Sequence, residues 1–165
     1  MGSKPTQTRT RRFDSAGHVV REAAGLTSAL PELWRVYRGG LSPALRERIM
    51  VAVSRANACA GCAKVHQRLA LRAGVTDEEL EELGLDEMSG LDPASRAAVV
   101  YAVERSQAGF PGTVGAPCAD PEVSAALDAH FTPAEIGQVD AVARGMTFAN
   151  LSVGTAEALR ERIGV

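Results

Sequence analysis

Aromatic residues are scarce in this chain of 165 residues, where they make up only 4% of the sequence. Stretches rich in β-branched residues are also few, and no segment alternates apolar and polar residues for long enough to predict a β-strand. Alanine, leucine, glutamate and arginine are abundant instead, and these residues favour helices. Because 45% of the residues are apolar, the composition excludes a disordered protein. We therefore predict an all-α globular fold.

Long hydrophobic runs are missing as well. No window of 18 uninterrupted apolar residues exists in the sequence, so we predict no membrane-spanning helix and no membrane partner. The pair Arg11-Arg12 before Phe13 is similar to the start of a twin-arginine export signal. The charged residues Asp14 and Glu22 lie where such a signal would need an apolar stretch. We therefore expect a cytoplasmic protein.

Acidic residues are absent from the first twelve positions, which contain four basic residues. Without these four, the remaining sequence has 14 basic and 20 acidic residues, a net charge of -6. A body with this charge does not attract nucleic acid, so we expect no nucleic-acid partner. We interpret residues 1–13 as a disordered, solvated basic leader and residues 14–165 as a single helical domain.

Helix start and stop signals recur along most of the sequence. Ser42, Asp92 and Asp120 each precede a proline, and Thr76 and Thr132 each begin a capping box. The predicted helices cover residues 31–38, 43–57, 59–73, 76–83, 93–104, 120–130, 132–150 and 155–162. A glycine- and proline-rich loop over residues 107–118 either connects two helices or gates a pocket. The expected architecture is a bundle of six to eight helices.

Cysteine is rare, with three residues in the chain, and two of them form a Cys-x-x-Cys motif at Cys59 and Cys62. An odd number of cysteines with one such pair is not a secreted disulfide framework. Two cysteines in this spacing at the start of a helix can form a disulfide, and the helix N-terminus stabilises a thiolate. His66 follows Cys62 by four residues, so its imidazole shares a helix face with that thiol and can accept its proton. This combination is what peroxide reduction or disulfide exchange requires.

Two other interpretations of this motif remain open, a zinc site and cysteines that only fill the core. A structural zinc site needs four ligands, and His18, Cys118 and His130 form no second local pair. We therefore predict no metal and no bound cofactor. We interpret both of these histidines as structural or surface residues, and Cys118 as an inert thiol, a third redox thiol or an intersubunit bridge. Trp34 and Tyr37 are interpreted as packing residues rather than substrate contacts.

Three stretches within residues 41–80 are similar to segments of one protein family. Residues 42–48 match its helix opening, residues 57–66 match its active-site helix, and residues 74–80 match the segment after that helix. Glu47 precedes the first cysteine by twelve residues, as the relay glutamate of this family does. On these residues the chain resembles the alkylhydroperoxidase D and carboxymuconolactone decarboxylase family.

This resemblance implies an all-helical fold that assembles into a homo-oligomer, a trimer or a hexamer. It implies antioxidant chemistry in which alkyl hydroperoxides or a partner peroxiredoxin are reduced, with electrons from an external dithiol such as a lipoylated protein. It assigns nucleophilic attack to Cys62 and resolution to Cys59, with His66 as base and Glu47 as proton acceptor or as the residue that orients the imidazole. The best-known peroxidases of this family have a second histidine just before the second cysteine, where this chain has Gly61.

The leading expectation is therefore a thiol-dependent peroxidase or disulfide reductase. Two alternatives share the sequence features. One is a carboxymuconolactone decarboxylase-like lyase, which does not need two cysteines. The other is a non-enzymatic redox sensor, in which the disulfide only changes oligomer contacts.

Overall fold

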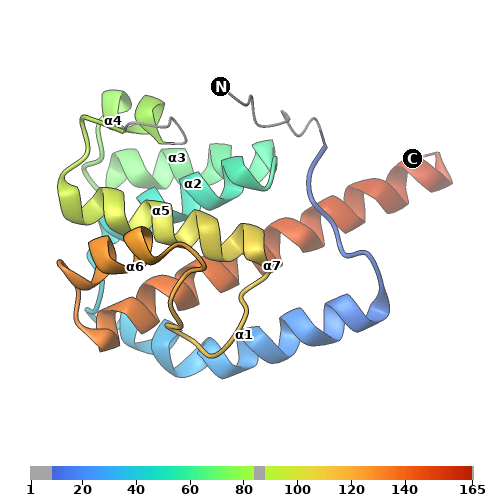
Figure 1. Cartoon of the computed structure of the whole chain (residues 1–165). Coiled ribbons are helices and arrows are strands. Elements are labelled where there is room, and N and C mark those ends of the chain that lie inside the picture. The colour runs from blue at the N-terminus through green and yellow to red at the C-terminus, as the bar shows by residue number, and fades with distance from the viewer. Residues whose placement is uncertain (1–8, 84–87, 165) are drawn as a thin grey trace.

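The computed structural model describes residues 9–83 and 88–164, and these residues form seven α-helices and no β-strand (Figure 1). The predicted all-α bundle of six to eight helices is confirmed for this part of the chain. None of its helices is long and apolar enough to cross a membrane. The helices are α1 (Ala16–Tyr37), α2 (Pro43–Ala56), α3 (Ala60–Arg72), α4 (Asp77–Glu82), α5 (Pro93–Ala108), α6 (Pro121–Asp128) and α7 (Pro133–Ile163).

Most helix starts lie where side-chain caps predict them. Ser42, Asp92 and Thr132 each accept a hydrogen bond from a backbone N–H three residues further on, and a proline follows each of them. Thr76 and Thr132 also form complete capping boxes. These starts depend on contacts within one turn, which explains why the sequence alone predicts them.

The prediction of a short helix over residues 31–38 is wrong in its bounds. It is the last part of α1, which has 22 residues and begins after the capping residue Ser15. Pro31 lies inside the helix, where it removes one backbone hydrogen bond. The helix continues through the proline because α1 packs along α7 and buries Ala29 and Val36.

The two helices predicted over residues 132–150 and 155–162 are one helix, α7, of 31 residues. Gly154 does not end it, although glycine disfavours a helix interior. A Cβ atom at Gly154 would lie 2.1 Å from the carbonyl oxygen of Arg11. The glycine therefore allows another segment of the chain to approach the helix closely.

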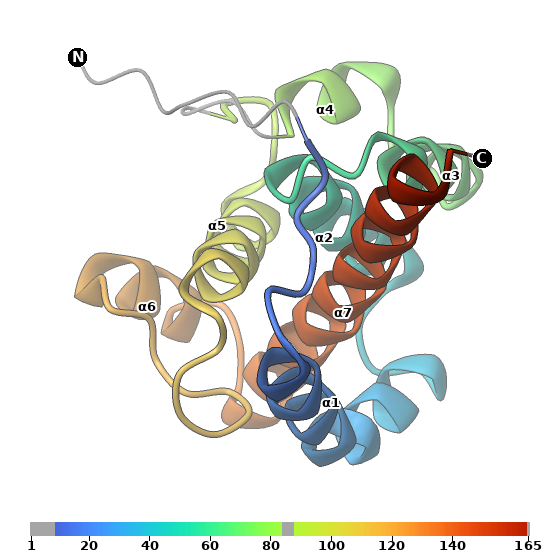
Figure 2. The ribbon, with the colours of Figure 1, turned by 90° about the vertical axis from the view of Figure 1, so that its right-hand side faces the viewer.

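The core forms around α7, which lies between α1 on one side and α2 and α5 on the other (Figures 1 and 2). Its buried residues Val139 and Val142 belong to the same apolar cluster as Ile49 and Val53 of α2 and Val99 of α5. Because α2 packs against this core and also against α3, it carries α3 at the outside of the bundle. This pair of helices positions the candidate site.

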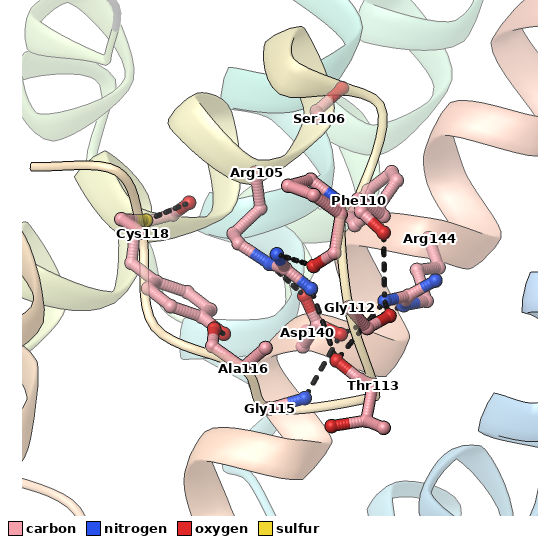
Figure 3. A network of polar contacts seen from close by, with 12 residues as sticks. Arg105, Ser106, Phe110, Gly112, Thr113, Gly115, Ala116, Cys118, Asp140 and Arg144 are labelled. Carbon is pink, nitrogen blue, oxygen red and sulfur yellow. Dashed lines mark hydrogen bonds and ion pairs between the residues drawn. The ribbon is translucent and has the colours of Figure 1, made fainter.

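Buried charges hold the glycine- and proline-rich loop between α5 and α6 (Figure 3). Asp140 accepts hydrogen bonds from Nε of Arg105 and Nε of Arg144, each at 2.8 Å, and all three side chains are at least 92% buried. Arg105 also donates to the carbonyl oxygens of Pro111 at 2.5 Å and Thr113 at 3.2 Å. The loop therefore closes over the ion pairs and supplies the remaining acceptors.

Residues 1–8 of the expected leader lie outside the described residues. For residues 10–13, which we call the N-terminal strap, the expectation of a solvated leader is wrong. The strap runs beside α2 and α7 (Figure 2). Thr10 donates to the carbonyl oxygen of Ala58, and the ring of Phe13 meets that of Phe148 edge-on at 5.5 Å. These polar and apolar partners come from distant parts of the chain, so no local sequence pattern predicts the contacts.

Candidate active site

Glu47 and His66 meet between α2 and α3. Oε2 of Glu47 lies 2.8 Å from Nδ1 of His66, and the Glu47 residue is only 4% exposed. Nineteen positions separate these residues in the sequence, and the antiparallel packing of the two short helices brings them together. In this contact the carboxylate can orient the imidazole, which is one of the two roles that the family resemblance implies for Glu47.

The carboxyl group of Glu47 stays ionised despite its burial. Burial by itself raises the pKa of this group, but the hydrogen bond and charge of His66 and those of Arg46 lower it, and the net pKa is below its ordinary value. Nε of Arg46 donates to Oε1 of Glu47 at 3.3 Å. Each carboxylate oxygen therefore has a partner.

This charge determines which nitrogen of His66 is available. An ionised carboxylate only accepts hydrogen bonds, so Nδ1 of His66 donates to Glu47. In a neutral imidazole the other nitrogen, Nε2, then holds the free lone pair. His66 is therefore oriented by Glu47 as a base that accepts a proton at Nε2.

The two cysteines of the motif form a disulfide at the start of α3. Cys59 is the residue that precedes the helix and Cys62 lies in its first turn, with 5.3 Å between their Cα atoms. Cys59 is 1% exposed, whereas Cys62 is only partly buried. An attacking reagent therefore reaches Cys62 more easily. His66 follows it by one helical turn.

All four predicted site residues thus lie on α2, on α3 or in the turn between them. A model of the carboxymuconolactone decarboxylase family matches residues 23–104, about half of the chain, and this range contains all four. The chain belongs to the carboxymuconolactone decarboxylase family. Searches of curated proteins and of solved structures found no match. The cysteine pair lies inside the matched range, while the strap and α7 lie outside it.

Gly61 lies at the exposed start of α3 in this family member. Apart from its chain neighbours and the backbone of its own helix, no described atom lies within 4 Å of the place where its Cβ would be. The position at which the best-known peroxidases have a second histidine therefore borders open space. Among the described residues, no other side chain fills it.

A pocket of about 400 Å³ borders the Glu47–His66 pair. It is lined by Tyr37, Pro43, Arg46, Glu47, Met50, His66, Leu69, Arg72 and Ala73. The guanidinium group of Arg46 lies 4.8 Å above the ring of Tyr37. No local spacing in the sequence predicts this pocket, because α1, α2 and α3 each contribute residues to it.

Trp34 and Tyr37, which we interpret as packing residues, do not belong to the buried core of the described chain. Their exposed fractions are 64% and 63%. Each ring stacks with an arginine, Trp34 with Arg38 and Tyr37 with Arg46. The apolar face of α1 that packs on α7 lies elsewhere on the helix.

The turn that precedes Cys59 is anchored by buried polar side chains. Nδ2 of Asn57 donates to Oγ of Ser106 at 3.2 Å and to Oδ1 of Asn150 at 3.1 Å. Asn150 donates in turn to Oγ of Ser54. Three helices, α2, α5 and α7, thereby meet beneath the cysteine pair. Of these buried polar residues, the sequence motif includes only Asn57.

Cys118 lies outside the cysteine pair, in the loop before α6. Its sulfur contacts the carbonyl oxygen of Tyr101 at 3.9 Å. Burial and the nearby charge of Glu104 raise the pKa of this thiol to about 12. At neutral pH it therefore stays protonated and reacts slowly.

The other histidines lie apart from this site. His18 of α1 pairs with Glu22 of the same helix and with Asp14, which precedes it, and His130 is exposed. In residues 9–83 and 88–164, no three histidine, cysteine, aspartate or glutamate side chains gather as metal ligands.

Proposed function

We propose that this family member is a thiol-dependent peroxidase or disulfide reductase that works through the Cys59–Cys62 pair. One observation carries this proposal: a disulfide at a helix start, whose less buried cysteine lies one turn from a histidine that a buried carboxylate orients. The difference in exposure favours Cys62 as the nucleophile and Cys59 as the resolving thiol.

The reduced protein would react as follows. Nε2 of His66 takes the proton of the Cys62 thiol, and the thiolate attacks the terminal oxygen of a hydroperoxide. The O–O bond breaks, the alcohol leaves with the proton from His66, and Cys62 becomes a sulfenic acid. The Cys59 thiol then attacks that sulfur, so that the disulfide forms and water leaves.

The cycle closes when an external dithiol reduces the disulfide by thiol–disulfide exchange, supplying two electrons and two protons. A lipoylated protein is our proposed donor, and a peroxiredoxin is an alternative partner. Glu47 keeps its charge throughout and stabilises the imidazolium that His66 transiently becomes. We also propose a cytoplasmic location and a homo-oligomer, a trimer or a hexamer. No bound cofactor is needed in this scheme.

The pocket favours a second candidate function, a lyase that acts on a lactone acid. Arg46 and Arg72 line it, and guanidinium groups bind carboxylates well. The Glu47–His66 pair at the same pocket could move a proton in such a reaction. This activity would not need the cysteines.

Thiol titration distinguishes these functions. The reduced protein has three thiols, and one equivalent of cumene hydroperoxide should leave one, with continued peroxide consumption when dithiothreitol is present. Cys118→Ser should turn over normally, and Cys62→Ser should not. Thiol loss without turnover would instead indicate a sensor. Lactone turnover by the Cys59→Ser/Cys62→Ser variant would indicate the lyase.

A further inference from the structure

The N-terminal strap, residues 10–13, contacts the turn from which the cysteine pair begins. We propose that the strap positions this redox turn, residues 57–58, and thereby stabilises the Cys59–Cys62 disulfide, with Arg11 as the positioning residue. The proposal rests on the redox function proposed for this pair. The strap lies outside the range that the family model matches, whereas the turn lies inside it.

The strap binds both carbonyl groups of the redox turn. The backbone N–H of Arg11 donates to the carbonyl oxygen of Asn57 at 3.0 Å, and the hydroxyl of Thr10 donates to that of Ala58 at 3.1 Å. Nη1 of Arg11 also donates to Oδ1 of Asn57 at 2.7 Å and to the carbonyl oxygen of Ser106 at 3.1 Å. Arg11 therefore connects the turn to the end of α5.

The redox turn has a conformation that needs such support. Ala58 has a φ of 55°, in the left-handed region that residues with a side chain rarely adopt. A conformation of this kind persists only where the surrounding structure holds it. The next residue, Cys59, donates its backbone N–H to the carbonyl oxygen of Ser54 at 2.9 Å. The turn thus determines where the first cysteine lies relative to α3.

The strap itself is held from the other side by α7 (Figure 2). The backbone N–H of Phe13 donates to Oγ1 of Thr155 at 3.1 Å, and the Phe13 ring lies against Phe148. The missing side chain of Gly154 lets the Arg11 backbone pass next to the helix. The strap therefore lies between α7 and the redox turn, and a displacement at either end is transmitted to the other.

A fixed turn favours the disulfide over the two thiols. Two groups held in bonding geometry react as if each were present at very high concentration. A released turn lowers this effective concentration, so the dithiol form gains at equilibrium. In a dithiothreitol buffer the disulfide takes two electrons and two protons from reduced dithiothreitol, giving two protein thiols and oxidised dithiothreitol.

The test uses three variants that act on the strap in different ways. Arg11→Ala removes the side-chain bonds to Asn57 and Ser106, and Arg11→Lys keeps the charge for a partial rescue. Gly154→Ala places a methyl group on α7 where it clashes with the backbone of the strap, and it removes no contact of the turn. Arg12→Ala is the matched control, because Arg12 is exposed and has no hydrogen bond within the described residues.

The readout is the equilibrium constant with dithiothreitol, measured by trapping free thiols with a mass tag in the full-length protein. We expect Arg11→Ala and Gly154→Ala to shift it about tenfold toward the dithiol, which raises the reduction potential by about 30 mV. Arg11→Lys should shift it less, and Arg12→Ala should match the wild type. Circular dichroism verifies that each variant is folded.

The proposal is overturned if Gly154→Ala and Arg11→Ala both have equilibrium constants within twofold of that of the control. If Arg11→Ala fails to fold, Gly154→Ala and Arg11→Lys decide the question. Peroxide turnover is not part of this readout. A failed peroxidase assay with shifted equilibria would reject only the proposed function, and normal turnover with unshifted equilibria would reject only the role of the strap.

Discussion

Glu47 is a buried carboxylate whose charge is retained because His66 and Arg46 lie against it. Its pKa in the folded protein is below the ordinary value of 4.5, so the folded state binds this proton less tightly than the unfolded chain does. The stabilisation that this difference contributes is complete above the ordinary pKa. It is lost as the pH falls through the lowered value.

The first prediction follows from the direction of this pKa shift. Glu47→Gln removes the titrating group, so the free energy of unfolding of the wild type should exceed that of the variant by more at pH 7 than at pH 3.5. Urea denaturation of both proteins at the two pH values measures the difference. A gap that stays constant, or that widens in acid, would contradict the assigned sign.

The second prediction concerns His66 as the base. His66→Gln should reduce the peroxidase rate by about 10²–10⁴-fold, with partial recovery at high pH, where hydroxide deprotonates Cys62. Glu47→Gln should cost less, because a glutamine oxygen can still accept the hydrogen bond from Nδ1. The measurement is the pH profile of Cys62 alkylation by iodoacetamide, with Cys59 and Cys118 replaced by serine. Superimposable profiles for the wild type and both variants would exclude the relay.

At the scale of helices, α5 and α7 are joined by a carboxylate that two arginines share. Arg105 and Arg144 are buried, and Asp140 is their common counter-charge. The same carboxylate accepts a hydrogen bond from the backbone of Gly115 at 3.1 Å. The loop before α6 therefore depends on this ion pair for its position.

The third prediction is that Asp140→Asn destabilises the protein strongly. The substitution keeps the side-chain shape but leaves two buried guanidinium groups without their counter-charge, which costs about 3–5 kcal/mol in comparable sites. Urea denaturation measures this free energy. Asp128→Asn, at an exposed position on α6, is the control and should change stability little. Equal stability of the two variants would show that the ion pairs contribute nothing.

For the molecule as a whole, large apolar side chains remain exposed along α1. Leu30, Trp34 and Tyr37 are 54%, 64% and 63% exposed, and their spacing of four and three residues places them on one face of the helix. Contiguous exposed apolar surface commonly marks an interface. This face is compatible with the homo-oligomer that the family resemblance implies.

The fourth prediction is that Leu30→Glu/Trp34→Glu weakens self-association. We expect the wild type to exceed the monomer mass of 17.3 kDa in light scattering at micromolar concentration. The double variant should move toward that mass, because charges at an apolar interface are costly to bury. Ser28→Glu, exposed on the same helix, should leave the mass unchanged. A wild type of monomer mass would refute the prediction.

Local chemistry explains what could be predicted from the sequence. The capping residues Ser42, Thr76 and Thr132 bond within one turn of their own helices. The spacing of Cys59, Cys62 and His66 fixes their shared helix face without reference to the rest of the fold. The placement of Glu47 came from the family resemblance, and the structure brings it to His66.

The remaining features depend on residues that are far apart in the sequence. Pro31 and Gly154 have local preferences that end helices, and packing against α7 and the strap overrides them. The local sequence predicts a solvated Arg11, because its acceptors at Asn57 and Ser106 come together only when α2 and α5 pack. Local hydrogen bonds thus set the helix starts, and local spacing sets the shared helix face of the cysteine–histidine motif. Burial and long-range pairing set how far the helices extend and what holds the motif in place.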